Sequence, residues 1–547
     1  MENKKIKKIF SRAALLSVFV LAACGNNEEA QGTENLEELP SIEDRYTPDS
    51  ETPAWELDTK EDNKLTWYIN ADWWNKEYGE DVITKKVKED LNLDIEFITG
   101  DDTNLNTYFA SGELPDIITI FDSNSDIARK ADDWALPLQD LADTYDPYFY
   151  EVAREDTMNW YQLEDEKTYG YPDYSNTAED FESGNIYARD AFIIREDVYK
   201  AIGEPDMTTP ENFKKAMNSI KEKFPDLIPF GFNDFAQDGT SNGSMDGIVQ
   251  DMLGVPYTDA DGNFYDRNLD EDYIEWVKAF RQVREDGNIS DDSFTDDGDS
   301  FKERIQTGQY ATVMIGSFVN QGIPLQTFAS SNPDAQYIAV DSIKSMKGNE
   351  PTLSQAGISG WMINYITKQA EDPAKAIQLF TYLLSDYGQM LTNFGIEGET
   401  YETVEDGKVK FTEETRNVQL NEPEKWQTEY RIGEFIQFGH DRYKALSDES
   451  YVDAVKQMQE WGQGKLQTQF ITENINPDSG TQEARSLSAI QTNWSTTLVG
   501  MLRAESDDEV DQLLNDYITF QEENNIDAIN EARNEKIQEN KEKLGIE

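Results

Sequence analysis

Four neighbouring residues near the start of the chain combine the side chains with which proteins recognise sugars. Asn70 and Asp72 stand beside Trp73 and Trp74, directly after the apolar run 65–69. Flat rings pack against the apolar faces of sugars, and carboxylates and amides bind the hydroxyl groups at their edges. We therefore expect this loop to contact a ligand. The alternative is that only one of the two tryptophans faces the ligand and the other belongs to the core.

A second pair of candidates, Phe121 and Asp122, ends the apolar run 117–121. In open α/β sheets, ligands collect at the carboxyl ends of strands, so we expect this pair at the ligand as well. Trp361, in the sequence GISGWMI, is open to two interpretations, a ligand contact at a hinge or a buried ring. Three lesser candidates for ligand contacts are Tyr187, Asp190 and Trp494.

Residue counts limit the catalytic chemistry open to this chain. His440 is the only histidine, so a zinc site of the HExxH type, which needs two, is excluded. Cys24 is the only cysteine, which excludes disulfides and thiol catalysis. Two carboxylates suffice for a glycosidase, and 109 acidic residues leave that possibility open. We expect a protein that is not an enzyme, with a cell-surface enzyme acting on glycosides through a carboxylate pair as the alternative.

The first 24 residues have the layout of a secretory signal. Five basic residues precede the apolar run 13–23, which is too short for the roughly 20 residues that span a bilayer. We therefore expect residues 1–23 to be a cleaved signal peptide. The sequence LAACG around Cys24 resembles the lipobox of bacterial lipoproteins, which implies a lipid on this cysteine. An ordinary signal peptide with an incidental cysteine is the alternative.

The chain is strongly acidic. Its 48 Lys and Arg residues against 109 Asp and Glu residues give a formal net charge of -61. Such a chain repels phosphates, so we expect no nucleic acid partner. We interpret the charge as a solvated surface suited to saline or alkaline surroundings, with a calcium or cationic ligand as the alternative. Residues 24–63 are rich in Glu, Asp, Asn, Thr and Pro and are expected to form a disordered tether.

The folded part alternates strands and helices. Apolar runs at 65–69 and 93–98 flank a helical pattern at 82–91, and this order predicts a parallel pair of strands. Helices are expected to begin at Pro210 and Pro373, because proline favours the first helical position. A further helix is expected from residue 507, and we expect a solvated helix that frays at the end of the chain. With 547 residues, the α/β chain is expected to form two or more domains.

Several segments together resemble a known family in their order and spacing. They are KLTWYINADWW, ASGELPDIITIFDS, DAFIIREDVYKAIG, TTPENFKKAM, REDGNIS, GQYATVMIGSF, EDPAKAIQLFTYLLSDYGQ and NFGIEGETY. The chain resembles the extracellular solute-binding lipoproteins of bacterial ABC importers, of the sugar-binding type, and within it the longer oligosaccharide-binding members. The resemblance runs through most of the chain.

This resemblance implies a type II periplasmic-binding-protein-like fold, with two α/β lobes joined by a hinge and the ligand cleft between them. The first lobe is expected to contain residues 64–185 and 355–412, and the second lobe residues 186–354 and 413–547. The family places ligand-contacting residues in the loop that corresponds to Asn70–Trp74. Phe318 corresponds to a site where the family often has a tryptophan, which implies a ligand contact with a smaller stacking area.

The resemblance does not extend to a metal site. Some longer members bind calcium in an acidic loop after the helix that corresponds to 213–224. Here residues 224–229 read FPDLIP, which is too short and too apolar to surround a cation that takes 6–8 oxygens. The run 259–263, DADGN, lacks the distal glutamate of an EF-hand and predicts a hairpin turn. We expect neither a metal nor a cofactor.

Together these observations favour a substrate-binding subunit of an ABC transporter. The resemblance implies that it captures an oligosaccharide by lobe closure and delivers it to membrane permease subunits. We expect a monomer on the outer face of the cytoplasmic membrane of a Gram-positive type of cell, anchored by the lipid on Cys24. A sensor subunit that presents its ligand to a membrane receptor would have the same sequence features and stays an alternative.

Overall fold

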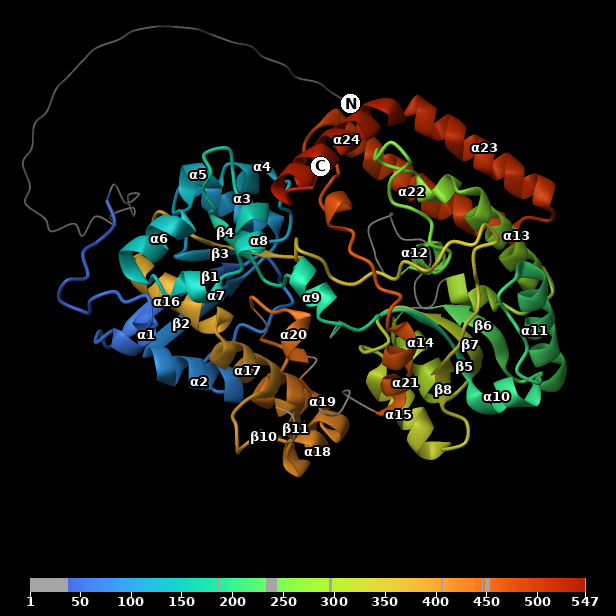
Figure 1. Cartoon of the computed structure of the whole chain (residues 1–547), viewed down its shortest axis with the longest axis horizontal. Helices are drawn as coiled ribbons and strands as arrows, with labels where there is room; N and C mark the ends of the chain where they lie inside the picture. The colour runs from blue at the N-terminus through green and yellow to red at the C-terminus, as the bar shows by residue number, and fades with distance from the viewer. Residues whose placement is uncertain are drawn as a thin grey trace, which may run out of the picture.

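The chain folds into two α/β lobes that lie side by side (Figure 1). The computed structural model describes residues 38–184, 186–232, 244–294, 298–404, 407–435, 437–444, 446–447 and 453–546. Cys24 and the expected signal peptide therefore lie outside the described residues. Within the described ranges, no helix has the length and apolar character needed to cross a membrane.

The first lobe is built on a five-stranded sheet. Its strands β1, β2 and β3 are parallel, while β9 is antiparallel to both β3 and β4. The parallel pair predicted for 65–69 and 93–98 is thereby confirmed, and so is the helix between them, α2 (Val82–Leu91), whose first turn is capped by Asp81. In sheet order, the strands are β2 (Leu93–Thr99), β1 (Asn63–Ile69), β3 (Ile117–Ile120), β9 (Ile363–Ile366) and β4 (Gly170–Pro172).

Helices cover both faces of this sheet. Trp67 and Ile69 of β1 pack on one face against α1 (Ala54–Leu57), α6 (Leu138–Tyr145) and α16 (Pro373–Leu384). Tyr68 of β1 points to the other face, where it packs with residues of α3 (Asp102–Ser111) and α5 (Ala131–Trp134). The alternation follows from the two-residue repeat of a strand. The helix predicted to start at Pro373 is confirmed as α16, and every residue of it is buried.

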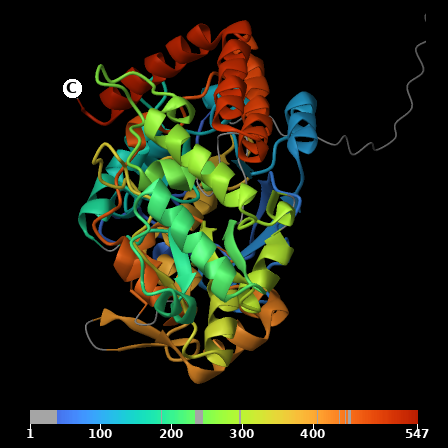
Figure 2. The same ribbon diagram turned by 90° about the vertical axis from the view of Figure 1, so that its right-hand side faces the viewer.

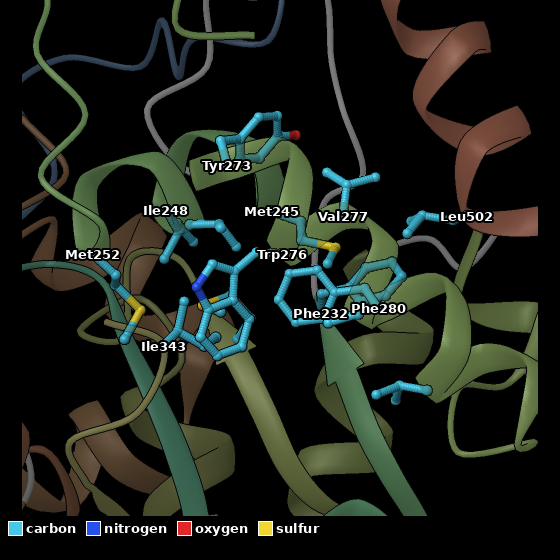
Figure 3. Close-up of a cluster of buried hydrophobic side chains, with 14 of the residues drawn as sticks. Phe232, Met245, Ile248, Met252, Tyr273, Trp276, Val277, Phe280, Ile343 and Leu502 are labelled. Atoms are coloured by element: carbon cyan, nitrogen blue, oxygen red, sulfur yellow. The ribbon is translucent and has the colours of Figure 1, made fainter. Parts of the chain in front are cut away.

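The second lobe has a four-stranded sheet, in the order β6 (Ile228–Phe232), β7 (Tyr310–Ile315), β5 (Ala191–Arg195) and β8 (Tyr337–Ala339). Strands β6 and β7 are parallel, and β5 is antiparallel to its two neighbours. The predicted helix at Pro210 is α11 (Pro210–Lys223), with Thr209 as its cap. Figure 3 shows Trp276 of α13 (Glu271–Glu285) at the centre of the core, with Ile248, Met252 and Ile343 around it.

The remaining elements surround these two sheets. In chain order they are α4 (Asp126–Arg129), α7 (Phe149–Val152), α8 (Glu155–Trp160), α9 (Ala178–Glu182), α10 (Glu196–Ala201), α12 (Met245–Met252), α14 (Gly298–Gln306), α15 (Gly322–Ser331), α17 (Asp386–Phe394), β10 (Tyr401–Thr403), β11 (Val409–Phe411), α18 (Glu413–Asn421), α19 (Pro423–Lys425), α20 (Asp441–Lys444), α21 (Asp453–Gly462), α22 (Gln482–Arg503), α23 (Asp507–Glu523) and α24 (Ile526–Lys543).

The carboxyl edges of both sheets face the segments that connect the lobes. The chain leaves the first sheet at the end of β4, which is parallel to β3, and enters the second sheet at the start of β5. Because β5 is antiparallel to β7, its start lies at the carboxyl edge of β6 and β7. The chain returns into β9 at the carboxyl edge of the first sheet. This is the edge at which ligands collect in open α/β sheets.

The C-terminal helices connect the two lobes. They cover the same end of the molecule in Figure 1 and in Figure 2, where the second lobe faces the viewer. Helices α22 and α23 and residue Ile529 of α24 belong to the core of the second lobe, whereas the end of α24 contacts α8 of the first lobe. Ile529 and Ile537 are fully buried, so the prediction of a fraying, solvated terminal helix was wrong.

The structure corrects two expectations about the chain's organisation. Residues 39–63 are not a disordered tether, because Ile42 and Tyr46 are buried in the core of the first lobe. Residues 413–444, expected in the second lobe, contribute Ile432 and Phe435 to that same first-lobe core. In both cases, a few well-spaced apolar residues in a polar segment suffice to hold it against the sheet.

Candidate ligand-binding site

Three of the predicted aromatic residues form a continuous, exposed surface that we call the ring platform, made of Trp73, Trp361 and Phe121. The rings of Trp73 and Trp361 are stacked, with centroids 6.0 Å apart and an interplanar angle of 12°. Phe121 meets Trp361 edge to face at 5.3 Å. Their exposed fractions are 63%, 48% and 37%, which is high for such large apolar side chains. Exposed rings grouped in this way mark binding surfaces.

Trp73 is presented by a short turn after β1. The backbone N–H of Ala71 donates to the carbonyl oxygen of Ile69, and that of Trp74 donates to Ala71. Trp74 points inward, is 8% exposed and packs against Phe435. Of the two alternatives for this pair of tryptophans, the structure therefore has one ring exposed and the other in the core.

Asn70 is buried and serves the turn itself. Its side-chain oxygen accepts a hydrogen bond from the Tyr68 hydroxyl at 3.0 Å, and its amide nitrogen donates to Asp102 at 2.7 Å. With both ends of the amide engaged, Asn70 holds the end of β1 against the start of α3. Asp72, in contrast, is exposed next to Trp73.

Trp361 lies in the second connecting segment, just before β9. The backbone N–H groups of Trp361 and Met362 both donate to the carboxylate of Asp173, at 3.2 and 2.8 Å. Gly360 has φ +61°, and a Cβ at this position would lie 2.3 Å from the carbonyl oxygen of Tyr174. The close approach of two connecting segments therefore fixes the turn that exposes Trp361.

Asp173 is a residue that the sequence analysis missed. It directly follows β4, so the same strand-end rule that singled out Asp122 could have found it. Its side chain is 1% exposed, and burial raises its pKa to about 7. Asp122 itself is exposed and accepts hydrogen bonds from the Asn124 N–H and from the Ser479 hydroxyl, which connects the first lobe to the segment before α22.

On the second lobe, Asp190 lies at the carboxyl edge of the sheet, next to the start of β5. One carboxylate oxygen accepts the N–H of Ser317 at 2.9 Å, while the other is buried without a hydrogen-bond partner. Burial raises the pKa of Asp190 to about 7, and the neighbouring Arg189 opposes that shift. Arg189, also missed from the sequence, donates to the Ser317 hydroxyl. Tyr187 is half-buried, and its carbonyl oxygen accepts from Gln355 of the returning segment.

Two further candidate residues are buried in the core of the second lobe. Phe318 is 0% exposed and packs in the core between the second sheet and α15, so the predicted ligand contact does not agree with the structure. Trp494 is 1% exposed, and its indole N–H donates to Asp246 at 3.0 Å inside the core of the second lobe. Both are large apolar side chains on core-facing positions of their elements, which the chain pattern alone does not separate from exposed ones.

Two cavities border the first lobe outside the ring platform. One, of about 620 Å³, is lined by Trp55, Arg154 and His440 among others. The other, of about 770 Å³, lies between the first lobe and α24 and includes Trp160 and Lys536.

The one histidine, His440, is buried in the first lobe. Burial lowers the pKa of His440 to about 4, and its Nδ1 is buried without a hydrogen-bond partner, 3.9 Å from Asp180.

The pentapeptide GTSNG at 239–243 has the spacing of a nucleophile elbow but lies outside the described residues. Within the described ranges, no group of three or more His, Cys, Asp or Glu side chains is placed to hold a metal ion. The predicted hairpin turn is confirmed: Asp259 accepts the N–H groups of Asp261 and Asn263.

A comparison with protein families adds independent information. Residues 73–390, more than half of the chain, match the family described as bacterial extracellular solute-binding proteins. The chain belongs to this family. The match begins at Trp73 and includes Phe121 and Trp361, so the whole ring platform of this solute-binding protein lies within the matched residues.

Two relatives show how far the sequence similarity extends. Lipoprotein LipO of Bacillus subtilis (strain 168) is 23% identical over 344 residues, which cover 58% of this chain and 62% of LipO. The fructooligosaccharide ABC transporter substrate-binding protein FusA of Streptococcus pneumoniae serotype 4 is 27% identical over 329 residues, covering 54% of this chain and 55% of FusA. Each match thus spans less than two thirds of the relative.

The fold agrees with solved members of the class. An HMO-binding, ABC-transporter-associated solute-binding protein from Bifidobacterium longum infantis superposes with a TM-score of 0.63 at 14% sequence identity, covering 87% of this chain and 99% of that one. The expected two-lobe, periplasmic-binding-protein-like α/β fold is therefore confirmed.

Proposed function

We propose that this solute-binding protein is the extracellular substrate-binding subunit of an ABC transporter and that its ligand is an oligosaccharide. The observation that carries the proposal is the ring platform at the carboxyl edge of the first sheet. The exposed parts of these rings are flat and apolar, and such surfaces match the apolar faces of sugar rings. The relatives support it, because FusA is a fructooligosaccharide-binding subunit and the Bifidobacterium protein is HMO-binding.

The polar partners of the sugar come from the surroundings of the platform. Asp72 and Asp122 lie exposed beside Trp73 and Phe121 and would accept hydrogen bonds from the hydroxyl groups of the sugar. The second lobe offers the half-buried Tyr187 at the edge that faces the connecting segments, and the buried Asp190 lies at the same edge. In this proposal, the two lobes close around the sugar, a hinge motion of the kind that brings residues of two domains onto one ligand.

The protein then delivers its sugar, chemically unchanged, to membrane permease subunits. A lipid on Cys24 would keep it at the outer face of the cytoplasmic membrane, and a monomer suffices for this task. Support comes from the secretory layout of residues 1–24 and from the relative named as a lipoprotein.

A ligand screen tests this function. The mature protein is heated with fructo-oligosaccharides, milk oligosaccharides, N-glycan fragments and alginate fragments, and the unfolding midpoint is recorded for each. A ligand that binds only the folded state increases the free energy of unfolding, by about 2.7 kcal/mol when its concentration is one hundred times its Kd. The unfolding midpoint rises as a result. One sugar class is expected to raise it, with the sugar recovered intact by mass spectrometry. Recovery of a shortened sugar would show that the protein is a glycoside-active enzyme instead. An unchanged midpoint with every sugar class would contradict an oligosaccharide ligand.

A further inference from the structure

Glu473, far from the platform in sequence, contacts the segment that carries Trp361. It lies directly after a short 3-10 helix (Phe470–Thr472). Its two carboxylate oxygens accept the backbone N–H groups of Ile358 and Ser359, at 3.3 and 2.9 Å. These two residues precede Trp361 by only three and two positions, so the carboxylate fixes the backbone on one side of the exposed ring while Asp173 fixes it on the other.

The contact between Glu473 and the Trp361 segment requires a glycine at position 357. A Cβ on Gly357 would lie 1.7 Å from a carboxylate oxygen of Glu473, so only glycine leaves room for this approach. The Tyr161 hydroxyl donates to the carbonyl oxygen of Ser359 from the first lobe. Ile358 is fully buried with Trp160 and Phe470 in a small core between the connecting segment, α8 and the C-terminal part.

The other end of this contact is attached to the second lobe. The side-chain amide of Asn540 on α24 donates to the carbonyl oxygens of Glu473 and Ile471, at 2.8 and 3.2 Å. The same helix enters the core of the second lobe through Ile529. A continuous chain of contacts therefore leads from the second-lobe core through α24 and Glu473 to the turn that exposes Trp361.

We propose that Glu473 is a positioning residue, which holds Trp361 in the ring platform and ties the ring to the C-terminal helix of the second lobe. The inference deepens the proposed function and rests on it, since it concerns how the same site recognises its sugar. Glu473 does not touch the sugar in this account. It acts through Trp361, and movement of the lobes is transmitted to the ring through α24.

The test uses the full mature protein labelled with 5-fluorotryptophan, so that each of its 11 tryptophans carries one fluorine atom that is observed by NMR. The Trp361→Phe variant assigns the Trp361 signal. Glu473→Gln removes one of the two backbone acceptors at nearly constant size and is expected to shift that signal without any sugar present. Gly357→Ala adds a side chain where the Glu473 carboxylate lies, and Asn540→Ala removes the hydrogen bond to the Glu473 backbone. Both variants are expected to shift the same signal, so the test stays valid if Glu473→Gln fails to fold.

Asp116→Asn is the matched control. Asp116 is a buried carboxylate that also accepts two backbone N–H groups, those of Thr66 and Glu371, but at the opposite end of β3. It is expected to leave the Trp361 signal in place. A Trp361 resonance unchanged in all three variants of the Glu473 contact, or shifted equally by Asp116→Asn, would overturn the proposal.

Affinity for the sugar found in the screen completes the test. Glu473→Gln is expected to weaken binding about fivefold or more in the native background, and to have no further effect once Trp361 has been replaced by alanine, because contacting residues couple while independent ones add. Equal losses in both backgrounds would show that Glu473 does not act through Trp361 and would overturn the proposal. If no sugar binds the wild type, the proposed function fails, while the fluorine shift still decides whether Glu473 positions the ring.

Discussion

Trp73 lies parallel to Trp361, with the two ring centroids 6.0 Å apart, although one ring follows β1 and the other precedes β9. The turn after β1 holds the first ring, whereas Asp173 and Glu473 hold the segment of the second. The stacked surface therefore exists only when the first sheet and the connecting segment are both in place.

Removing either stacked ring is expected to weaken ligand binding. Trp73→Ala and Trp361→Ala each delete an apolar surface whose burial is worth about 1.5–3 kcal/mol, which corresponds to about a ten- to hundredfold higher Kd. Titration calorimetry with the sugar found in the screen measures this. Tyr150→Ala, which removes a ring that is 46% exposed but lies outside the platform, is the control and is expected to bind normally. Unchanged affinity in both tryptophan variants would place the ligand elsewhere.

Two of the buried candidates, Phe318 and Trp494, are expected to affect stability instead. Phe318→Ala and Trp494→Ala each leave a cavity in the core of the second lobe, and such changes lower the free energy of unfolding by about 3–5 kcal/mol. Urea unfolding measures the loss. Calorimetry at a temperature where the variants stay folded is expected to give the wild-type Kd. A large loss of sugar affinity at unchanged stability would instead show that these residues contribute to the binding site.

His440 makes stability depend on pH in a defined direction. Its pKa is about 4 in the folded chain, because burial and the nearby Arg154 disfavour the charged ring, against about 6.5 when unfolded. The unfolded state binds more protons between these values, so the stabilisation is complete above pH 6.5 and is lost as pH falls toward 4, by up to about 1.4 kcal/mol per pH unit. The charged groups that act on the ring are Asp180, Arg154, Arg442 and Asp386.

The single histidine makes this easy to measure. The proton NMR signal of the imidazole carbon-bound hydrogen is expected to titrate with a midpoint near pH 4 in the folded protein. His440→Gln is expected to remove this part of the acid loss of stability, as seen by urea unfolding at pH 5 and pH 7. A midpoint near 6.5 would mean that the ring is solvated, contrary to its 8% exposed fraction.

The N-terminal segment is expected to stabilise the first lobe. Arg45 donates to both Asp58 and Asp372, and the Asp58 side chain is fully buried. Arg45→Ala removes charge-assisted hydrogen bonds and is expected to lower the free energy of unfolding by about 2 kcal/mol. Lys200→Ala, which breaks an exposed pair with Glu196, is the control and is expected to cost less than about 1 kcal/mol. Equal effects of the two changes would mean that the segment contributes little.

Local patterns in the sequence predicted several of the elements and the exposed residues of the site. Strand ends identified Trp73 and Phe121, and the strand and helix periodicities identified β1, α2 and α16. The packing of residues 39–63 was missed, because Ile42 and Tyr46 are isolated in an acidic segment, and only the tertiary contact with α16 explains their burial. The same holds for Glu473, one acid among many, whose role comes from the close approach that Gly357 permits.

Lobe closure on a sugar is tested most directly by a distance between the lobes. Spin labels on Glu89→Cys of α2 and Lys215→Cys of α11, both at exposed positions, report one lobe each in a mature protein whose Cys24 is replaced by serine. Double electron–electron resonance is recorded with and without the sugar found in the screen. We expect the distance distribution to shift to shorter values and to narrow when the sugar binds. A sugar that binds with an unchanged distribution would contradict capture by lobe closure.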